Sequence, residues 1–290
     1  MSFDLRPRRS ALYVPGENER AMDKAANLPA DVLIFDLEDS VGVDRKDDAR
    51  TQVCRRIDSG LYAPREIVVR VNAIDTPWHE RDVTAATKSG ADAILVPKIE
   101  SADQIDAVCA LLDSLSVPPS IAVWVMIETP RAFLDVARIA DAGDRLNAFV
   151  IGTNDLISDM RARSVPGRAP VLAALSMSVL AARAAGIAIL DGVFNALDDD
   201  DGYQAELRQG REMGFDGKTV VHPRQILPAN EIFGPGIDEV EYARAVIEAF
   251  DESERAGRNV TVVAGQMIEE LHVRDARRTL TMVETLESNR

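Results

Sequence analysis

The sequence predicts a single β/α barrel of the TIM type with a C-terminal helical extension. The chain has 290 residues, 46% of them hydrophobic, which is enough to bury one large core. A β/α barrel typically needs about 250 residues. Short apolar runs alternate with amphipathic stretches at intervals that suit βα units and a parallel sheet. There are eight such runs, the number that closes a barrel.

The predicted strands are nearly continuous apolar runs, as expected for a sheet that is covered on both faces. In chain order they are Ser10–Val14, Asp31–Asp36, Glu66–Val71, Ala93–Pro97, Ile121–Ile127, Ala148–Gly152, Ile187–Leu190 and Lys218–Val221. Amphipathic segments between them predict helices, for example Ala102–Leu115 and Val171–Ala185, with Gly186 as the stop signal of the second. We assign residues 1–235 to the barrel, as the catalytic domain.

The pattern changes after the last predicted strand. Prolines punctuate a short helix, and Ile237–Ala256 then predicts a long amphipathic helix. A last unit follows, with Asn259–Ala264 and a helix from Met267 onward. This extension, residues 236–290, is more than a barrel needs. We expect it either to pack on a neighbouring subunit or close over the site, or to seal the base of the barrel.

Composition argues against several classes of partner. The formal net charge is −15 and the isoelectric point is near 4.7, so the surface would repel nucleic acid and anionic lipid. No apolar span approaches the roughly 20 residues that cross a bilayer, and Ala11–Val14 is too short for a signal-peptide core. Cys54 and Cys109 have neither disulfide nor zinc-site spacing, which fits a reducing cytoplasm.

Charged and polar residues follow the predicted strands with unusual regularity. In a β/α barrel the loops after the strands converge on one mouth, where the chemistry takes place. A lone buried charge is costly, so residues of this kind indicate a site. They are Asp36, Glu38, Asp39, Arg70, Asn72, Lys98, Glu128, Asn154, Asp155, Asp191 and His222.

Glu128 and Asp155 form the most informative pair. Each follows an apolar run, and the two runs are neighbours in the predicted barrel, so both carboxylates can reach one point. Two carboxylates, with the other positions left to water and substrate oxygens, are a usual way to hold Mg²⁺. An alternative is that Glu128 belongs to a helix entry, because Thr129 and Pro130 follow it.

Arg70 ends an otherwise apolar strand. Its guanidinium is expected to pair with the acidic residues after the second strand, to hold a substrate carboxylate in a two-pronged contact, or to do both.

Three other residues have a chemical and a structural interpretation. Lys98 is either a Schiff-base lysine or the partner of a salt bridge to Glu100 or Glu128, and the salt bridge is favoured. His222, ahead of a proline, is either an acid or base or a packed turn residue, and the turn is favoured. Asp191, before a glycine, is interpreted as a turn residue.

Eight segments, taken in order, resemble the motifs of the citrate lyase β-subunit-like proteins of the HpcH/HpaI aldolase/citrate lyase superfamily. This family includes malyl-CoA and citramalyl-CoA lyases. The resemblance covers nearly the whole chain. The segments are Arg9–Gly16, Phe35–Val41, Val69–Asn72, Val96–Lys98, Ile127–Pro130, Ile151–Leu156, Leu190–Val193 and Gly214–Pro223.

The resemblance implies a role for the residues at the predicted mouth. It implies that Glu128 and Asp155 are the Mg²⁺ ligands and that Arg70 holds the carboxylate of a 2-oxoacid. The resemblance also implies a substrate contact for Glu128. The acidic residues Asp36, Glu38 and Asp39 would lie beside the metal, orient Arg70, and supply a substrate contact from Glu38 and a fallback base from Asp36 or Asp39.

The resemblance also implies how coenzyme A is bound. Tyr13 and Lys24 match positions that contact the nucleotide of CoA, and Arg20 lies nearby as a phosphate partner. In a chain this acidic, local basic groups are needed to receive phosphates.

One departure from the family concerns the C-terminal segment. Stand-alone CoA lyases and thioesterases of the family often carry Met-Ile-Asp there, with the aspartate entering the neighbouring subunit's active site. This chain has Met267-Ile268-Glu269, which keeps the carboxylate but lengthens its reach. Glu269 is therefore our candidate for proton transfer, and thioesterase activity is put in doubt.

The predicted function is Mg²⁺-dependent cleavage of a short 3-hydroxyacyl-CoA, of the citramalyl-CoA or malyl-CoA type, to an acyl-CoA and pyruvate or glyoxylate. The resemblance implies a homotrimer or homohexamer. Three alternatives remain: a β subunit that acts on a carrier-protein thioester, a non-catalytic ligand-binding or assembly barrel, and a metal-dependent aldolase that uses free pyruvate without CoA.

Overall fold

The structure, a computed structural model, describes residues 6–257 and 260–288. The chain divides into two compact units, of which the larger is Arg8–Asn230 and the other includes everything from Glu231 onward. A functional boundary after residue 235 stays a prediction.

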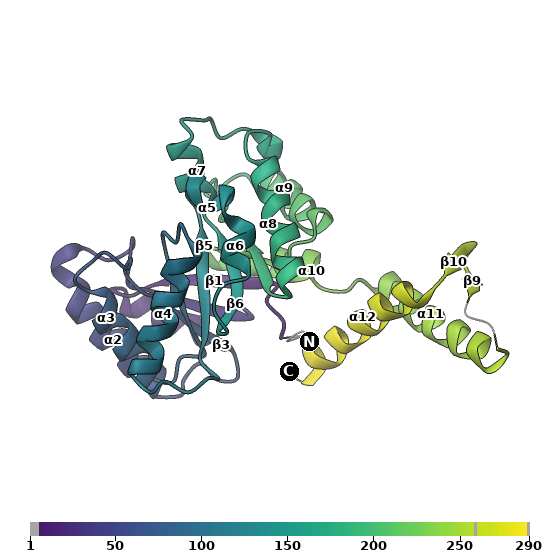
Figure 1. The fold of residues 1–290 in the computed structure, drawn as a ribbon, viewed down its shortest axis with the longest axis horizontal. Coiled ribbons are helices and arrows are strands. Elements are labelled where there is room, and N and C mark those ends of the chain that lie inside the picture. The colour runs from purple at the N-terminus through teal and green to yellow at the C-terminus, as the bar shows by residue number, and fades with distance from the viewer. Residues whose placement is uncertain (1–5, 258–259, 289–290) are drawn as a thin grey trace. The chain divides into compact units, whose positions relative to one another are not determined.

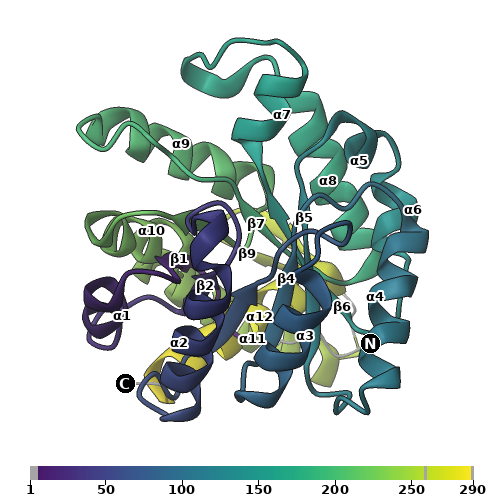
Figure 2. The same ribbon diagram turned by 90° about the vertical axis from the view of Figure 1, so that its left-hand side faces the viewer.

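The larger unit is a closed barrel of eight parallel strands, each paired with the next, with β8 returning to β1 (Figures 1 and 2). This confirms the predicted fold class. The strands are β1 Ser10–Pro15, β2 Val32–Asp36, β3 Glu66–Arg70, β4 Ala93–Val96, β5 Ala122–Ile127, β6 Leu146–Ile151, β7 Ala188–Asp191 and β8 Gly217–Val220.

Helices surround the strands, as Figure 2 shows. The predicted helix stop at Gly186 is confirmed, because this residue caps its helix with a φ of 74°, which glycine adopts without steric cost. The helices of this part of the chain are α1 Glu19–Ala25, α2 Lys46–Asp58, α3 His79–Lys88, α4 Ala102–Ser114, α5 Pro130–Leu134, α6 Val136–Ala140, α7 Thr153–Asp159, α8 Leu172–Ala185, α9 Asp200–Met213 and α10 Ile226–Phe233, with short 3₁₀ turns η1 Val43–Arg45, η2 Pro166–Arg168 and η3 Pro223–Gln225.

Alternate residues of the strands fill the barrel interior. Side chains on a strand point to opposite faces in turn, so residues two apart share a face. The interior cluster includes Ile34, Val68 and Met126. Continuing the alternation from these three places Asp36, Arg70 and Glu128 on the inward face, where each strand reaches the mouth.

The other end of the barrel is closed by charged and aromatic side chains. Arg8 donates to both carboxylate oxygens of Glu66, at 2.7 and 2.8 Å, and to Asn147 Oδ1 at 2.7 Å. Its guanidinium carbon lies 5.0 Å from the centre of the Trp124 ring, which is fully buried. The interior is therefore a packed core rather than a pore.

The C-terminal unit contains two long helices joined by a small hairpin (Figure 1). These elements are α11 Ile237–Arg255, β9 Thr261–Val263, β10 Gln266–Ile268 and α12 Glu270–Ser288. The predicted helix start at Met267 is wrong, because Met267 lies in β10, antiparallel to β9. The reason is the two-residue turn, in which Ala264 and Gly265 both have positive φ, 50° and 79°, as a tight hairpin turn requires.

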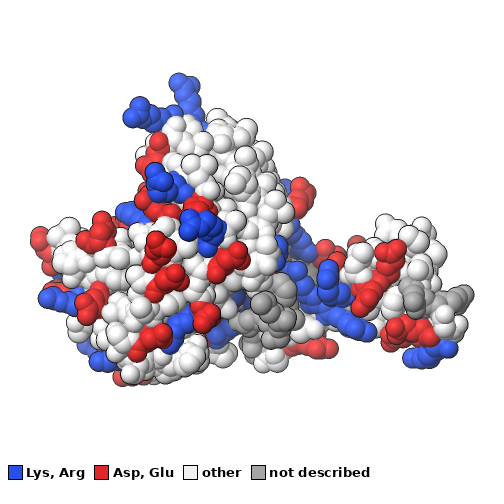
Figure 3. All heavy atoms as spheres, viewed as in Figure 1, with Lys and Arg blue, Asp and Glu red and all other residues white. Residues whose placement is uncertain are grey.

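The charge of the surface is dispersed on the face of the barrel that Figure 3 shows. Acidic and basic side chains are interspersed there. Within the described part of the chain, no helix is both long and apolar enough to cross a membrane.

Candidate active site

The mouth of the barrel is organised around a buried ion pair. Asp36, the last residue of β2, accepts hydrogen bonds from Arg70 Nε and Nη2, both at 2.7 Å. It also accepts from the backbone N–H groups of Glu38 and Ser40, at 2.9 and 3.0 Å. Burial raises the pKa of Asp36, but the charge and hydrogen bonds of Arg70 outweigh this and lower it. The predicted pairing of Arg70 with the acidic residues after the second strand is confirmed.

Glu38 connects Arg70 to a second basic residue. Its Oε2 lies 3.0 Å from Arg70 Nη1, and its Oε1 lies 3.0 Å from Lys98 Nζ. Burial raises the pKa of Glu38, although Arg70 opposes the rise. Asp39 lies further from Arg70 Nη1, at 3.5 Å, with a side chain that is 60% exposed.

Lys98 does form a salt bridge, but with a different partner than expected. The predicted partners were Glu100 or Glu128, whereas the ammonium pairs with Glu38. The backbone explains this, because Lys98 has a φ of 56°. Its N–H then donates to Glu128 Oε1 at 2.7 Å, while its side chain reaches across to the loop after β2. The hydrogen bond to Glu38 raises the pKa of Lys98, which keeps the amine protonated and disfavours the Schiff-base interpretation.

Glu128, which follows β5, is 1% exposed. Burial raises its pKa to about 8, and the charge of Asp155 and a hydrogen bond with that residue add to the rise. The glycine that follows β6 makes room for it, since a Cβ on Gly152 would lie 2.4 Å from Glu128 Cβ and 2.6 Å from Oε2. The predicted helix entry is confirmed, with Pro130 as the first residue of α5, but Thr129 and not Glu128 caps this helix.

Asp155 lies in the first turn of α7, directly after β6, and β5 and β6 are paired strands. The structure thus brings the two carboxyl groups together. No cluster of three or more His, Cys, Asp or Glu in metal-binding geometry occurs among residues 6–257 and 260–288. The predicted ligand set of two carboxylates therefore leaves most of a cation's coordination to water or substrate.

Two other buried polar residues fix the loop after β2. Lys46 donates from Nζ to the carbonyl oxygens of Leu37 and Glu38, at 2.9 and 2.7 Å. Asn72 Nδ2 donates to Leu37 O at 3.0 Å and to Asp82 Oδ2 at 2.6 Å. These hydrogen bonds fix the backbone of the loop that carries the acidic residues after β2.

The three residues predicted to contact CoA lie in different surroundings. Tyr13 faces the barrel interior, and the Arg70 guanidinium carbon lies 4.9 Å from the centre of its ring. Burial raises the pKa of the Tyr13 hydroxyl. Arg20 and Lys24 are exposed on α1.

The interpretation of Asp191 as a turn residue is wrong. It is the last residue of β7, fully buried, and accepts from Arg168 Nη1 at 2.7 and 2.8 Å. Lys218 Nζ lies 3.3 Å from Asp191 Oδ2 and donates to Glu206 Oε1 at 2.7 Å and to the Gly192 carbonyl. This network was not predicted from the sequence, although Lys218 within an apolar strand is a signal for a buried partner.

His222 is a helix cap, which confirms the turn interpretation. Its Nδ1 accepts from Arg224 N at 3.2 Å at the start of η3.

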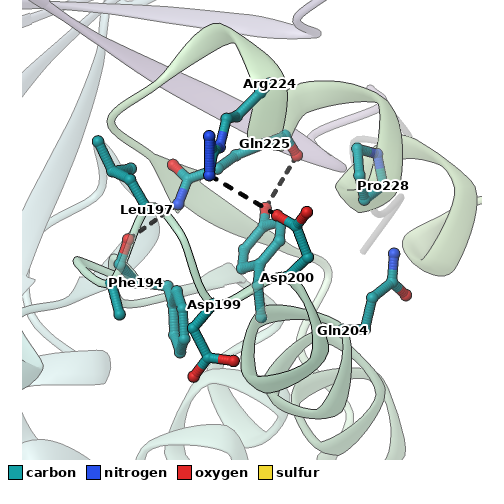
Figure 4. Close-up of a pocket in the computed structure, with 10 residues that line it drawn as sticks. Phe194, Leu197, Asp199, Asp200, Gln204, Arg224, Gln225 and Pro228 are labelled. Carbon is teal, nitrogen blue, oxygen red and sulfur yellow. Dashed lines mark hydrogen bonds and ion pairs between the residues drawn. The ribbon is translucent and has the colours of Figure 1, made fainter.

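A cavity of about 320 Å³ lies near His222 and is lined from the loops after β7 and β8, α9 and the start of α10 (Figure 4). Several of its polar groups are engaged with protein partners. Gln225 donates to Phe194 O at 2.8 Å and accepts from Tyr203 Oη at its backbone oxygen at 2.9 Å. Arg224 pairs with Asp198 and Asp200, at 3.2 and 3.8 Å.

Glu269 belongs to the C-terminal unit. It lies between β10 and α12, partly exposed, and its backbone N–H donates to His272 Nδ1 at 3.1 Å. Its predicted entry into a neighbouring active site stays a prediction.

An eight-stranded β/α barrel with paired carboxylates and a buried arginine at the mouth defines an enzyme of the β/α-barrel class. The pattern of the HpcH/HpaI aldolase/citrate lyase family matches residues 9–223, and the chain belongs to this family.

Several relatives of the chain have names that agree with this family. It is 45% identical over 286 residues to a (3S)-malyl-CoA thioesterase of Cereibacter sphaeroides, covering 99% of this chain and 98% of the relative. It is 33% identical to the citrate lyase subunit beta of Leuconostoc mesenteroides, covering 96% and 93%.

Solved structures agree as well. The CitE protein of Mycobacterium tuberculosis, in complex with magnesium, acetoacetate and coenzyme A, has a TM-score of 0.73 and 29% identity, covering 95% of this chain and 97% of that one. The citrate lyase beta subunit of M. tuberculosis with oxaloacetate and magnesium has a TM-score of 0.67 and 30% identity, covering 80% and 100%.

Proposed function

We propose that this enzyme is a Mg²⁺-dependent carbon–carbon lyase that cleaves a short 3-hydroxyacyl-CoA, of the malyl-CoA or citramalyl-CoA type, to an acyl-CoA and a 2-oxoacid. The observation that carries the proposal is the meeting of Glu128 and Asp155 beside the Arg70–Asp36 ion pair. The complexes of related proteins with magnesium, CoA and oxaloacetate support it.

The site has the chemistry of a divalent-cation site. Asp36, Glu38, Asp39, Glu128 and Asp155 outnumber the basic groups near them, and Glu38 Oε2 is buried without a completed hydrogen bond. A bound Mg²⁺ would relieve this excess of negative charge and act as a Lewis acid toward substrate oxygens. Glu128 and Asp155 would hold it.

The reaction needs a charge-stabilising group and a proton acceptor. When a carboxylate base accepts the hydroxyl proton, the oxygen forms the carbonyl of the 2-oxoacid, the carbon–carbon bond breaks, and its electrons pass to the acyl-CoA α carbon. Arg70 holds the carboxylate of the oxoacid end and stabilises the anionic transition state. The resulting enolate takes a proton to give the acyl-CoA.

Glu269 of a neighbouring subunit is our candidate for proton transfer at the CoA carbon. Asp36 is poorly suited as the fallback base, because it accepts four hydrogen bonds and its pKa is lowered. Asp39, which is more exposed, is the better second choice.

Hydrolysis of a malyl-CoA-type thioester is a second candidate function. The 45% identical relative named (3S)-malyl-CoA thioesterase favours it. The glutamate at position 269, where an aspartate is the family pattern, argues against full hydrolytic activity, because its carboxylate reaches further by one methylene.

The decisive experiment uses purified protein with Mg²⁺ and a panel of 3-hydroxyacyl-CoA esters. A lyase releases pyruvate or glyoxylate and leaves the acyl thioester intact. A thioesterase releases free CoA thiol and the hydroxy acid, so a coupled dehydrogenase assay and a thiol reagent separate the two.

Activity on free CoA esters would exclude an obligate carrier-protein partner. Release of neither product would favour the non-catalytic barrel, and cleavage without any CoA ester would favour an aldolase of free pyruvate.

The remaining proposals concern assembly, cofactor contacts and compartment. A homotrimer or homohexamer would allow Glu269 to reach a neighbouring mouth. Tyr13, Arg20 and Lys24 are proposed CoA contacts, and the free thiols of Cys54 and Cys109 support a reducing cytoplasm.

A further inference from the structure

One side of the Arg70 guanidinium, two of its five N–H groups, is already bound to a carboxylate of the protein. Nε and Nη2 bind the two oxygens of Asp36, each at 2.7 Å. The guanidinium also lies against the Tyr13 ring. Nη1 contacts the other acidic residues, Glu38 at 3.0 Å and Asp39 at 3.5 Å, so with the Asp36 pair in place a further carboxylate reaches the guanidinium from the Nη1 side.

Nη1 is held by a weaker contact than the other two nitrogens. Glu38 Oε2 lies 3.0 Å away but is buried without a completed hydrogen bond. A buried carboxylate oxygen that lacks a well-aligned donor is unfavourable. The contact between Glu38 and Nη1 is therefore the one that a better-fitting carboxylate can replace.

Glu38 bridges two cations, and the second is the more accessible. Lys98 Nζ contacts the other oxygen of Glu38 at 3.0 Å, and its side chain is 49% exposed. A non-glycine residue with positive φ is uncommon and clusters at functional sites. Here that backbone lets Lys98 contact Glu128 with its N–H while its ammonium extends over the mouth.

We propose that Glu38 occupies, in the resting site, the place that the carboxylate of the 2-oxoacid end takes on binding, and that Lys98 binds this carboxylate together with Arg70 Nη1. This inference rests on the proposed function and adds two roles to it. Glu38 becomes an internal competitor of the substrate, and Lys98 becomes a substrate-binding residue.

Because Glu38 spans both cations, a carboxylate that replaces it meets both. Asp36 keeps Nε and Nη2 throughout, so Arg70 does not have to turn. Glu38 lies on the loop after β2, outside the barrel strands. A ligand that carries an uncharged amide in place of this carboxylate would compete poorly with Glu38 for the two cations.

The test is direct binding by calorimetry, with saturating Mg²⁺, of pyruvate and of its uncharged analogue pyruvamide. We expect Glu38→Gln to bind pyruvate about tenfold more tightly than the wild type, and Lys98→Met about tenfold more weakly. Pyruvamide binding should change less than about twofold in both variants. Glu100→Gln makes the same charge change close to Lys98, on a residue that does not contact Arg70, and should match the wild type.

Weaker pyruvate binding by Glu38→Gln would overturn the proposal, because Glu38 would then merely orient Arg70. Equal effects on pyruvate and pyruvamide would overturn it too, since a distorted site weakens both ligands. Should Glu38→Gln fail to fold, Glu38→Asp serves instead, as its shorter side chain cannot span both cations. If the wild-type protein binds neither pyruvate nor glyoxylate, the proposed function itself fails, which is a different result.

Discussion

Asp36 and Arg70 are paired residues at the ends of the neighbouring strands β2 and β3, and two parallel hydrogen bonds of 2.7 Å join their side chains. Two-pronged contacts of this kind fix the plane as well as the position of a guanidinium. The orientation of Arg70 is thus set by the protein before any ligand arrives.

Asp36→Asn should disorient Arg70. The amide keeps the shape of the side chain but cannot accept both hydrogen bonds, so we expect turnover to fall by about 100-fold. Steady-state kinetics with the best substrate of the panel would measure the change. Asp31→Asn is a matched control, because Asp31 accepts from Arg9 in the same two-pronged way before β2 begins, at the opposite end of the strand from the mouth. That variant should lose stability and keep its turnover.

Removal of either proposed metal ligand should abolish the response to magnesium. A ligand that binds only the folded protein raises its melting temperature, so Mg²⁺ should stabilise the wild-type protein. Glu128→Ala and Asp155→Ala should show no such rise and no turnover. Normal turnover of either variant in the presence of a chelator would refute the assignment.

Magnesium affinity should depend on pH through Glu128. Its raised pKa, about 8, means that the metal-free site holds a proton at lower pH and must release it to bind a cation. We expect the affinity to fall by up to about tenfold for each pH unit below 8 and to level off above it. Calorimetry at several pH values measures this directly. An affinity that does not change between pH 6 and pH 8 would contradict the prediction.

The same proton should affect the stability of the metal-free protein. Between the usual carboxyl pKa of 4.5 and about 8, folded Glu128 retains a proton that the unfolded chain has released, so its contribution to stability falls as pH rises through this window. Denaturant titrations of the wild-type protein and Glu128→Gln should therefore diverge toward pH 8. Parallel curves would contradict the raised pKa.

Gly152→Ala should displace Glu128. The added methyl group would lie 2.4 Å from Glu128 Cβ, closer than two carbons can approach. We expect a loss of magnesium response with a cooperative unfolding transition still present, as melting curves with and without Mg²⁺ would show. Gly42→Ala is the control, since its new Cβ would meet nothing closer than Arg45 Cγ at 3.9 Å. A normal magnesium response in Gly152→Ala would show that the residues at the barrel mouth shift to make room for the added methyl group.

Local sequence patterns predicted the barrel and most of its mouth. Asp36, Arg70 and Glu128 could be recognised because each stands at the end of an apolar run. Both the run and the charged residue after it are visible in neighbouring positions of the sequence. The ion-pair partners of these charged residues could not be predicted in the same way. Arg168 reaches Asp191, and Lys98 reaches Glu38, through contacts that depend on how loops with positive φ fold back.

The second strand of the C-terminal hairpin, β10, was missed for a different reason. The strands of this hairpin have three residues each, too short to show a period of two, and an adjoining helical pattern absorbed Met267. The turn at Ala264 and Gly265 was the only local signal.

Arg8, Glu66 and Trp124 close the far end of the barrel interior. A ligand therefore reaches the proposed site from the side of Arg70 and Glu128. If cleavage yields two products, both leave on this side. The product that lies deeper in the barrel is then released after the product that lies closer to the solvent.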